Sequence, residues 1–156
     1  MRLRASSTVL ALAATVVMGL GLYFAFLRPP MLAEDARYLG ASLATLETTA
    51  SGLSAWLRHV FWVMGGFMFA TGLLTFYVAV TAFRTRARGA AAIAAIAGAS
   101  SVGSMVVVNF LIASDFKWHL LVLALLWTLA LALHRLEGPR TAPTTDRRLP
   151  GMAPQP

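Results

Sequence analysis

The sequence predicts an all-α integral membrane protein, a four-helix bundle with an extracytoplasmic amphipathic helix between the first and second spans. Of its 156 residues, 58% are hydrophobic and 12% are charged, whereas about 25% of the residues in a soluble domain are charged. The hydrophobic residues gather in four almost uncharged segments, each near the ~20 residues that a helix needs to cross a bilayer. These segments leave no room for a soluble catalytic domain, so we treat residues 1–136 as a single membrane domain.

The first span covers residues 8–27 and ends before Arg28 and the pair Pro29 and Pro30. Proline lacks the backbone N–H that would continue a helix, so the span ends there. The apolar run is longer than the core of a signal peptide, which is about 7–15 residues, and no small-residue cleavage pattern follows it. We therefore expect an uncleaved helix.

The other three spans are expected to form the rest of the bundle. Residues 60–83 and 89–113 lie on either side of a short basic turn, 84–88. The fourth span, 116–134, is the shortest, and it reaches the full bilayer thickness only if Lys117 extends its ammonium toward the lipid head groups. The short turns between the spans predict two antiparallel hairpins.

Basic residues predict the orientation, because the cytoplasmic loops of membrane proteins are enriched in Lys and Arg. With both termini in the cytoplasm, nine of the 13 basic residues lie inside and four outside, and the acidic residues leave the whole net charge of +7 inside. Contact with anionic lipid accounts for this charge without nucleic acid. The excess of Arg over Lys fits a bacterial protein, so we predict a multi-pass protein of the bacterial cytoplasmic (inner) membrane with both termini cytoplasmic.

Between the first and second spans, apolar residues recur at helical spacing. Leu32, Ala36, Leu39, Leu43 and Leu46 are separated by four, three, four and three positions. This is the pattern of a single apolar stripe on a helix. We expect an amphipathic helix over about 32–48 that packs on the outer face of the bundle through its leucines.

The last segment, residues 137–156, contains five prolines and almost no large apolar side chain. This composition is typical of chains that do not fold. We expect a disordered cytoplasmic tail.

Small residues occur at helical spacing in the second and third spans. In the second span Gly65, Met68, Gly72 and Thr75 share a face, and in the third Ala94, Gly98, Ser101 and Met105 do so. Small side chains let membrane helices approach closely. We favour packing within the bundle, and a homodimer interface is the alternative.

No ionisable residue lies deep within a span. Such residues mark proton relays and ion pathways, so the sequence argues against a proton-coupled antiporter. Asn109 is the strongest polar side chain inside a span, and we expect it to hydrogen-bond a neighbouring helix rather than a ligand. The chain has no cysteine and no nucleophile or phosphate-binding motif, so we predict no enzyme activity, no cofactor and no metal.

Two histidines, His59 and His119, lie at the outer ends of the second and fourth spans and therefore on the same side of the bundle. Histidines from two helices can ligate a haem or a metal. A small membrane redox or ligand-binding protein is therefore the alternative function. We favour the simpler interpretation, in which each histidine is an amphipathic anchor at the interface.

The remaining polar residues of the outer side form a candidate site. Its members are Glu34, Asp35, Arg37, Tyr38, Arg58, Asn109, Asp115 and Lys117, with His59 and His119 beside them. The interpretation that we favour is a solvated rim in which acids and bases pair with one another, because surface ion pairs are ordinary.

Two stretches of the sequence resemble a family of small, uncharacterised bacterial four-helix integral membrane proteins. The stretches are Glu34-Asp35-Ala36-Arg37-Tyr38-Leu39-Gly40, and Trp56-Leu57-Arg58-His59-Val60-Phe61 leading into Gly65-Gly66-Phe67-Met68. The resemblance covers about residues 29–84. It implies a four-helix membrane fold and no catalytic residues.

From these patterns we expect a non-enzymatic inner-membrane protein, an accessory or interaction subunit that uses its outer surface for recognition. The expected partners are membrane lipids, and a second membrane protein or a second copy of the chain is a further candidate. The polar outer rim and the lack of buried ionisable residues motivate this expectation.

Overall fold

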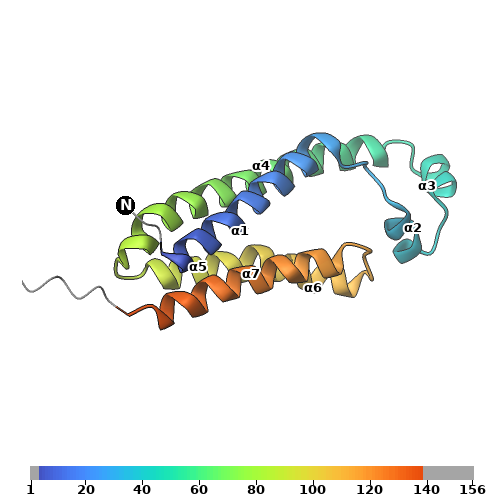
Figure 1. The fold of residues 1–156 in the computed structure, drawn as a ribbon. Coiled ribbons are helices and arrows are strands. Elements are labelled where there is room, and N and C mark those ends of the chain that lie inside the picture. The colour runs from blue at the N-terminus through green and yellow to red at the C-terminus, as the bar shows by residue number, and fades with distance from the viewer. Residues whose placement is uncertain (1–3, 139–156) are drawn as a thin grey trace, which may run out of the picture.

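The structure is a computed structural model that describes residues 4–138, and this part of the chain contains helices and no strands. Four long helices form the bundle and two short helices join the first pair (Figure 1). The elements are α1 (Ala5–Leu22) with the π-helical turn Tyr23–Leu27, α2 (Ala33–Leu39), α3 (Leu43–Thr49), α4 (Leu53–Val78) with the π-helical turn Ala79–Phe83, α5 (Ala90–Gly98), the π-helical turn Ala99–Gly103, α6 (Ser104–Leu111) and α7 (Lys117–Leu136).

Four helical rods are long and apolar enough to cross a membrane, as the sequence predicts. They cover Ala5–Leu27, Leu53–Phe83, Ala90–Leu111 and Lys117–Leu136. The second rod begins at Leu53 rather than at residue 60, and the fourth has 20 residues, so it needs no extension to reach the usual span length. By length and composition, the chain is a multi-pass membrane protein.

The bundle has two different ends (Figure 1). We call the end with Arg4 and Glu137 the proximal end, and the opposite end, with α2 and α3, the distal end. At the proximal end the Ser6 Oγ donates to Glu137 Oε2 at 2.6 Å, and the Arg4 guanidinium donates to the Gly138 carbonyl at 3.2 Å. Of the predicted disordered tail, Glu137 and Gly138 are thus held against the start of α1, and residues 139–156 lie outside the described part of the chain.

The predicted amphipathic helix over 32–48 is wrong as a single packed element, because the segment forms two short helices. Gly40 ends α2 in the left-handed region, with φ of 68°, and Ser42 begins α3 by accepting a hydrogen bond from the Thr45 N–H at 3.1 Å. Leu39 and Leu43 are exposed, at 55% and 37%, whereas Leu32, Ala36 and Leu46 are half-buried, so the predicted stripe does not pack on the bundle along its whole length. A glycine in αL favours the end of a helix over its continuation.

Glycines bring α1 and α4 close together along most of their length. A Cβ on Gly21 would lie 2.8 Å from the Gly65 carbonyl oxygen, and one on Gly72 would lie 2.8 Å from the Ala14 carbonyl oxygen. Small residues permit this approach, and it gives van der Waals contact between backbones where lipid would otherwise intervene. Gly65 and Gly72 therefore serve packing within the bundle, as the favoured interpretation of their spacing expects.

The buried core lies toward the proximal end, where all four rods meet. It includes Leu10, Ala13, Val17, Ala79, Phe83, Ala94, Val102, Leu123, Trp127 and Ala130. The Trp127 indole covers Gly98, and its Nε1 donates to the Ala94 carbonyl at 2.9 Å. Ala94 and Gly98 thus pack against α7 within the same chain.

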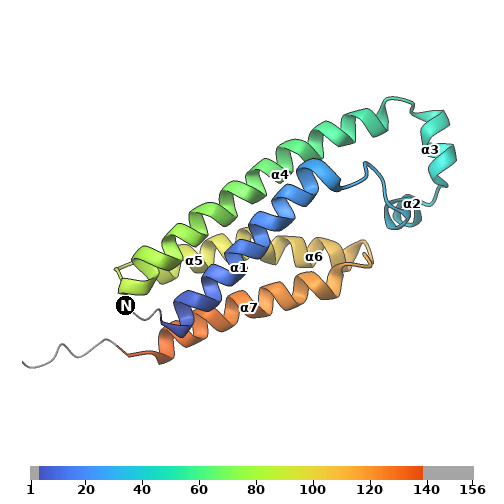
Figure 2. The same ribbon diagram turned by 45° about the horizontal axis from the view of Figure 1, so that its top comes forward.

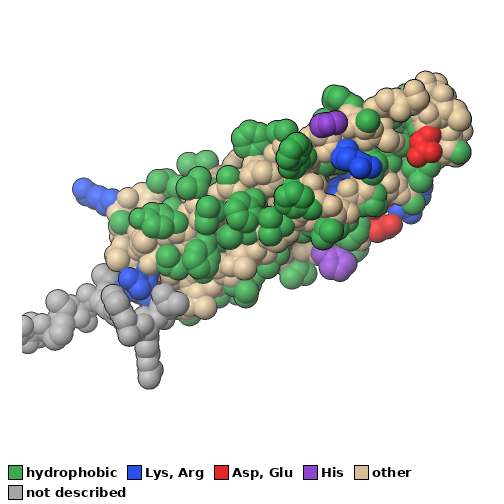
Figure 3. Space-filling view, turned by 90° about the horizontal axis from the view of Figure 1, so that it is seen from above, with side chains coloured by type: hydrophobic (Ala, Val, Ile, Leu, Met, Phe, Trp, Pro, Cys, Tyr) green, Lys and Arg blue, Asp and Glu red, His purple; other side chains and the backbone are tan. Residues whose placement is uncertain are grey.

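Toward the distal end the bundle opens. The pair α1 and α4 diverges from the pair α6 and α7, as both ribbon views show (Figure 2). Hydrophobic side chains cover the long body of the bundle, and charged side chains gather toward its two ends (Figure 3). This surface is typical of a protein whose long sides face lipid.

A candidate ligand groove at the distal end

The space between the diverging pairs is a cavity of about 860 Å³. One wall comes from α1 with its π-helical turn and from α4, the other from α6 and α7, and the short helix α2 reaches the mouth through Leu32 and Glu34. Cavities of about 300–1,000 Å³ are the size that holds a small organic ligand. We call this cavity the distal groove.

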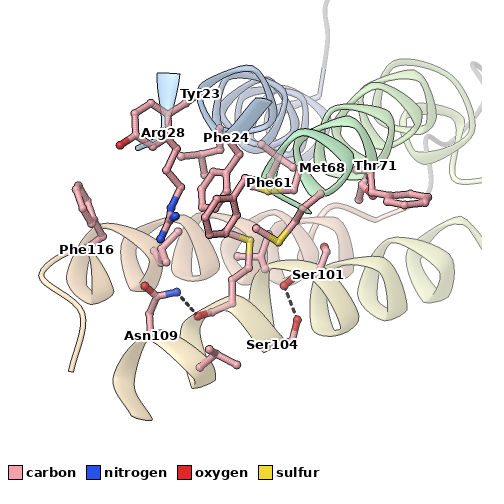
Figure 4. A pocket seen from close by; sticks show the side chains of 18 of the residues that line it. Tyr23, Phe24, Arg28, Phe61, Met68, Thr71, Ser101, Ser104, Asn109 and Phe116 are labelled. Carbon is pink, nitrogen blue, oxygen red and sulfur yellow. Dashed lines mark hydrogen bonds between the residues drawn. The ribbon is translucent and has the colours of Figure 1, made fainter. Parts of the chain in front are cut away.

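The walls of the distal groove are almost entirely apolar, with methionines from both sides (Figure 4). Met64 and Met68 lie on α4 and Met105 on α6. Methionine side chains are flexible and polarisable, so they adapt to ligands of variable shape. The hydroxyls of Ser101 and Ser104 are bonded to backbone carbonyls of their own helix, at 2.5 Å to Ala97 and 2.8 Å to Ser101, and so add little polarity to the wall.

Two residues of the groove lining also lie on the surface of the bundle. Val63 and Phe67 both line the groove, and they are 59% and 72% exposed on the surface of α4. These residues lie within the apolar span Leu53–Phe83. The groove therefore reaches the apolar surface of this span.

Arg28 brings a positive charge to the mouth of the groove. Its side chain is only 10% exposed, and its guanidinium lies 3.8 Å from the centroid of the Phe61 ring and 5.4 Å from that of Phe24. Stacking of this kind stabilises a cation at a desolvated site. Figure 4 shows the Arg28 side chain pointing from the α1 side into the groove, toward the wall that carries Asn109.

The Arg28 guanidinium also holds α2 in place. It donates to Asp35 Oδ2 at 3.3 Å and to the Pro29 carbonyl at 3.1 Å. Asp35 accepts a second bond from the Leu32 N–H at 2.8 Å, which begins α2. These contacts therefore hold the segment after the first span close to Phe24 and Phe61 at the groove mouth.

Glu34 ties α2 to the turn between α6 and α7. Its side chain is buried, at 6% exposure, and its two oxygens accept from the Ser114 Oγ at 2.9 Å and from the Asp115 N–H at 2.8 Å. Arg37 adds an exposed ion pair with Asp115, in which its Nη2 donates to both carboxylate oxygens at 3.0 Å. Buried hydrogen bonds to a carboxylate contribute more than an exposed ion pair, so Glu34 is the main tie.

The structure divides the members of the predicted outer site between contacts at the groove mouth, the groove lining and positions outside the groove. Glu34, Asp35, Arg37 and Asp115 take part in the contacts above, with Arg28, which the prediction did not include, as the partner of Asp35. Asn109 and His119 line the groove. Tyr38 and Arg58 are exposed and do not line the groove, and neither does Lys117. The predicted site is therefore not one compact pocket. We call the residues that join α2 to the rest of the distal end, which are Arg28, Glu34, Asp35, Arg37, Ser114 and Asp115, the strap.

The predicted hydrogen bond from Asn109 to a neighbouring helix is wrong. Its Nδ2 donates to the Met105 carbonyl at 2.8 Å, one turn back on the same helix, and not to a neighbouring helix. The reason is that the distal ends of α4 and α6 diverge, so the side chain turns back to its own backbone. Asn109 lines the groove instead (Figure 4).

The two histidines of the alternative function have different surroundings. His59 is exposed, and its Nδ1 lies 2.7 Å from the Ala55 carbonyl oxygen on its own helix. His119 lines the groove and lies beside Phe116, with 6.3 Å between the ring centroids. The structure does not place both rings in the groove, and within residues 4–138 no three His, Asp or Glu side chains gather in a way that could hold a metal ion.

Arg28 is the site residue that the sequence reasoning missed. It counts there only as the charge that ends the first span. The signal that could have found it is its position directly after the aromatic run Tyr23, Phe24 and Phe26, because an arginine next to aromatic rings can fold back onto them.

No known protein family, curated protein or solved structure matches this chain. The resemblance to small bacterial four-helix membrane proteins stays a prediction, and it transfers no residue roles. The functional argument therefore rests on the geometry of the distal groove.

Proposed function

We propose that the chain is a non-enzymatic accessory protein of the membrane that binds the apolar part of an amphiphile in its distal groove. The observation that carries the proposal is the apolar cavity of about 860 Å³, whose lining includes the surface-exposed Val63 and Phe67. In a span that crosses a bilayer, an apolar cavity is filled by hydrocarbon far more favourably than by water. In a membrane, the molecules that can supply this hydrocarbon are lipids and other amphiphiles, through their acyl or alkyl chains.

The distribution of charge supports a binding role over a transport role. The charged residues that line the groove, Arg28 and Glu34, both lie at its mouth, and each has partners within the chain. Most of the other lining residues are apolar, and Thr71, Ser101, Ser104 and Asn109 are uncharged. A proton or ion pathway needs ionisable groups along its length, and His119 is the one further residue of this kind, among Asp, Glu, His, Lys and Arg, in the described lining.

We place the proximal end in the cytoplasm of a bacterial cell, with the groove mouth and α2 on the outer side of the inner membrane. The support is the excess of basic residues on the side of both termini. In this orientation α2 and α3 present Tyr38, Leu39 and Leu43 outward as exposed side chains. These side chains support a second role for the segment, recognition of a partner protein at the outer surface.

The groove is tested by cross-linking with a phospholipid that carries a diazirine in its acyl chain, in nanodiscs that contain the full-length protein. We expect saturable cross-links on Met64, Met68 and Met105, which peptide mass spectrometry locates. Replacing Met105 with Trp fills the groove and should remove most of this labelling.

The matched control is Leu74→Trp, which adds the same side chain on an exposed face of α4 outside the groove. It should leave the groove labelling unchanged. Labelling spread evenly over all lipid-facing side chains, and unaffected by Met105→Trp, would show that the groove holds no ligand.

A further inference from the structure

We propose that the ligand of the distal groove is a zwitterionic phospholipid whose head group carries a primary ammonium beside its phosphate. This inference rests on the proposed function, because it names the class of amphiphile that the groove binds. The acyl chains lie along the methionine walls, the phosphate meets Arg28, and the ammonium meets Glu34.

Arg28 fits a phosphate ester because its guanidinium is rigidly placed and has donors to spare. The contact with the Phe61 ring, 3.8 Å from the guanidinium carbon to the ring centroid, holds it at the groove mouth. A guanidinium carries five N–H donors, and the structure uses one on the Pro29 carbonyl and one on Asp35. The rest remain for an anion, and arginine binds phosphate oxygens in a forked geometry.

The contact with Asp35 leaves room for this anion. The Arg28 Nη2 to Asp35 Oδ2 distance is 3.3 Å, longer than the about 2.7–2.9 Å of a strong charge-assisted hydrogen bond. Asp35 also has a tighter partner in the Leu32 N–H, at 2.8 Å. The carboxylate therefore orients Arg28 and does not occupy the groove, since Asp35 is not among the residues that line it.

Glu34 determines the rest of the head group. Arg28 and Glu34 supply one positive and one negative charge to the groove lining, so a lipid of net negative charge would place an uncompensated charge beside a buried carboxylate. A carboxylate has about four acceptor positions, and Ser114 and Asp115 use two of those on Glu34. An ammonium next to the phosphate can take the others, which gives complementary charges at both groups.

The experiment is native mass spectrometry of the full-length protein in detergent, with three lipids of identical acyl chains added in turn. The lipids are phosphatidylethanolamine, phosphatidylglycerol and diacylglycerol. We expect the affinity to fall in that order, with at least a tenfold gap between phosphatidylethanolamine and diacylglycerol. Equal affinity for all three, or a preference for phosphatidylglycerol, would overturn the head-group assignment.

Substitutions at Arg28 and Asp35 test which residues determine the preference for the lipid head group. Arg28→Gln should reduce the preference for phosphatidylethanolamine over diacylglycerol by about tenfold, whereas the matched control Arg58→Gln, an exposed arginine outside the groove, should not change it. Asp35→Asn keeps a cap for α2 and frees the guanidinium, so it should raise the affinity for phosphatidylethanolamine. If Arg28→Gln does not fold, Asp35→Asn decides, and an unchanged or lower affinity in that variant contradicts the inference.

Two further measurements distinguish a failure of the head-group inference from a failure of the proposed groove function. Soluble phosphoethanolamine should not displace the lipid, because the acyl chains supply most of the contact. Displacement by it would show a site for a free phosphate compound instead. If Met105→Trp abolishes binding of all three lipids while Arg28→Gln changes nothing, the groove function stands and the head-group inference fails, and if no lipid binds the native protein, both fail.

Discussion

At the proximal end the Trp127 indole fills the space between α5 and α7, whereas at the distal end Met68 and Met105 face a cavity of about 860 Å³. Both ends are built on the same close contact of α1 with α4, through Gly72 near the core and Gly21 and Gly65 farther out. The difference lies in what the second pair of helices places against that contact. At the proximal end, the Trp127 side chain packs on Gly98 and closes the bundle. At the distal end, the flexible Met68 and Met105 side chains have no such glycine opposite them, and the bundle stays open.

Polar ties explain why the distal end stays open and ordered. Glu34 bonds the turn between α6 and α7, and Arg28 bonds α2 from the α1 side. These contacts hold the ends of both helix pairs to one short helix. We expect a strap of this kind to maintain the separation of the two helix pairs.

The largest expected effect tests the proximal core. Trp127→Ala removes a buried side chain and its hydrogen bond to the Ala94 carbonyl, and truncations of this kind cost about 3–5 kcal/mol. Phe67→Ala removes an aromatic ring from the groove wall that is 72% exposed, and it should cost less than 1 kcal/mol by comparison. Reversible unfolding in mixed micelles measures both, and equal losses would show that the two ends are packed alike.

The next effect tests the strap. Glu34→Ala leaves the buried Ser114 hydroxyl and the Asp115 N–H without their partner, which should cost about 1–3 kcal/mol. The cost should appear as local opening, with faster hydrogen exchange over residues 33–39 and 113–116 and unchanged exchange in the proximal core. The control is Glu47→Ala, at an exposed position on α3. Unchanged exchange in the Glu34 variant would refute the strap.

A smaller effect is the pH dependence of the proximal end. Burial raises the pKa of the Glu137 carboxyl, but hydrogen bonds from the Ser6 Oγ and N–H outweigh it, so the pKa lies below its ordinary value. This contribution to stability is complete at neutral pH and is lost as the pH falls from the ordinary pKa, about 4.3, through the lowered one. Comparing the acid unfolding of the native chain with that of Glu137→Gln should show a slope in the native chain that the variant lacks. Parallel acid profiles would argue against it.

The smallest effect concerns the distal turn. Ala113 adopts the left-handed region with φ of 52° at the end of α6, a conformation that glycine adopts without the cost of a side chain. Ala113→Gly should therefore stabilise the protein by about 0.5–1 kcal/mol. A thermal melt measures this gain, and a loss of stability would show that the Ala113 methyl group makes a contact worth more than the strain.

The sequence predicts the four rods well and the distal details poorly, for physical reasons. A span follows from local hydrophobicity, which is why all four appear near their predicted positions. The stripe of Leu39 and Leu43 is also local, but the ties of Glu34 and the break at Gly40 decide which face of the segment is exposed. The role of Arg28 depends on Phe61, far along the chain, and the partner of Asn109 depends on how far α4 and α6 diverge. Neither can be derived from spacing alone.

The most direct test of the account is a pair of spin-label distances in lipid nanodiscs. The chain has no cysteine, so labels at Trp62→Cys and Leu111→Cys report the distal separation of α4 and α6 without further changes. Labels at Tyr77→Cys and Ile93→Cys report the proximal approach of α4 and α5, and all four positions are exposed. We predict a clearly longer mean distance with a narrow distribution for the distal pair in the bilayer. A distal distance that collapses to the proximal value would contradict the existence of the groove, and with it the proposed binding function.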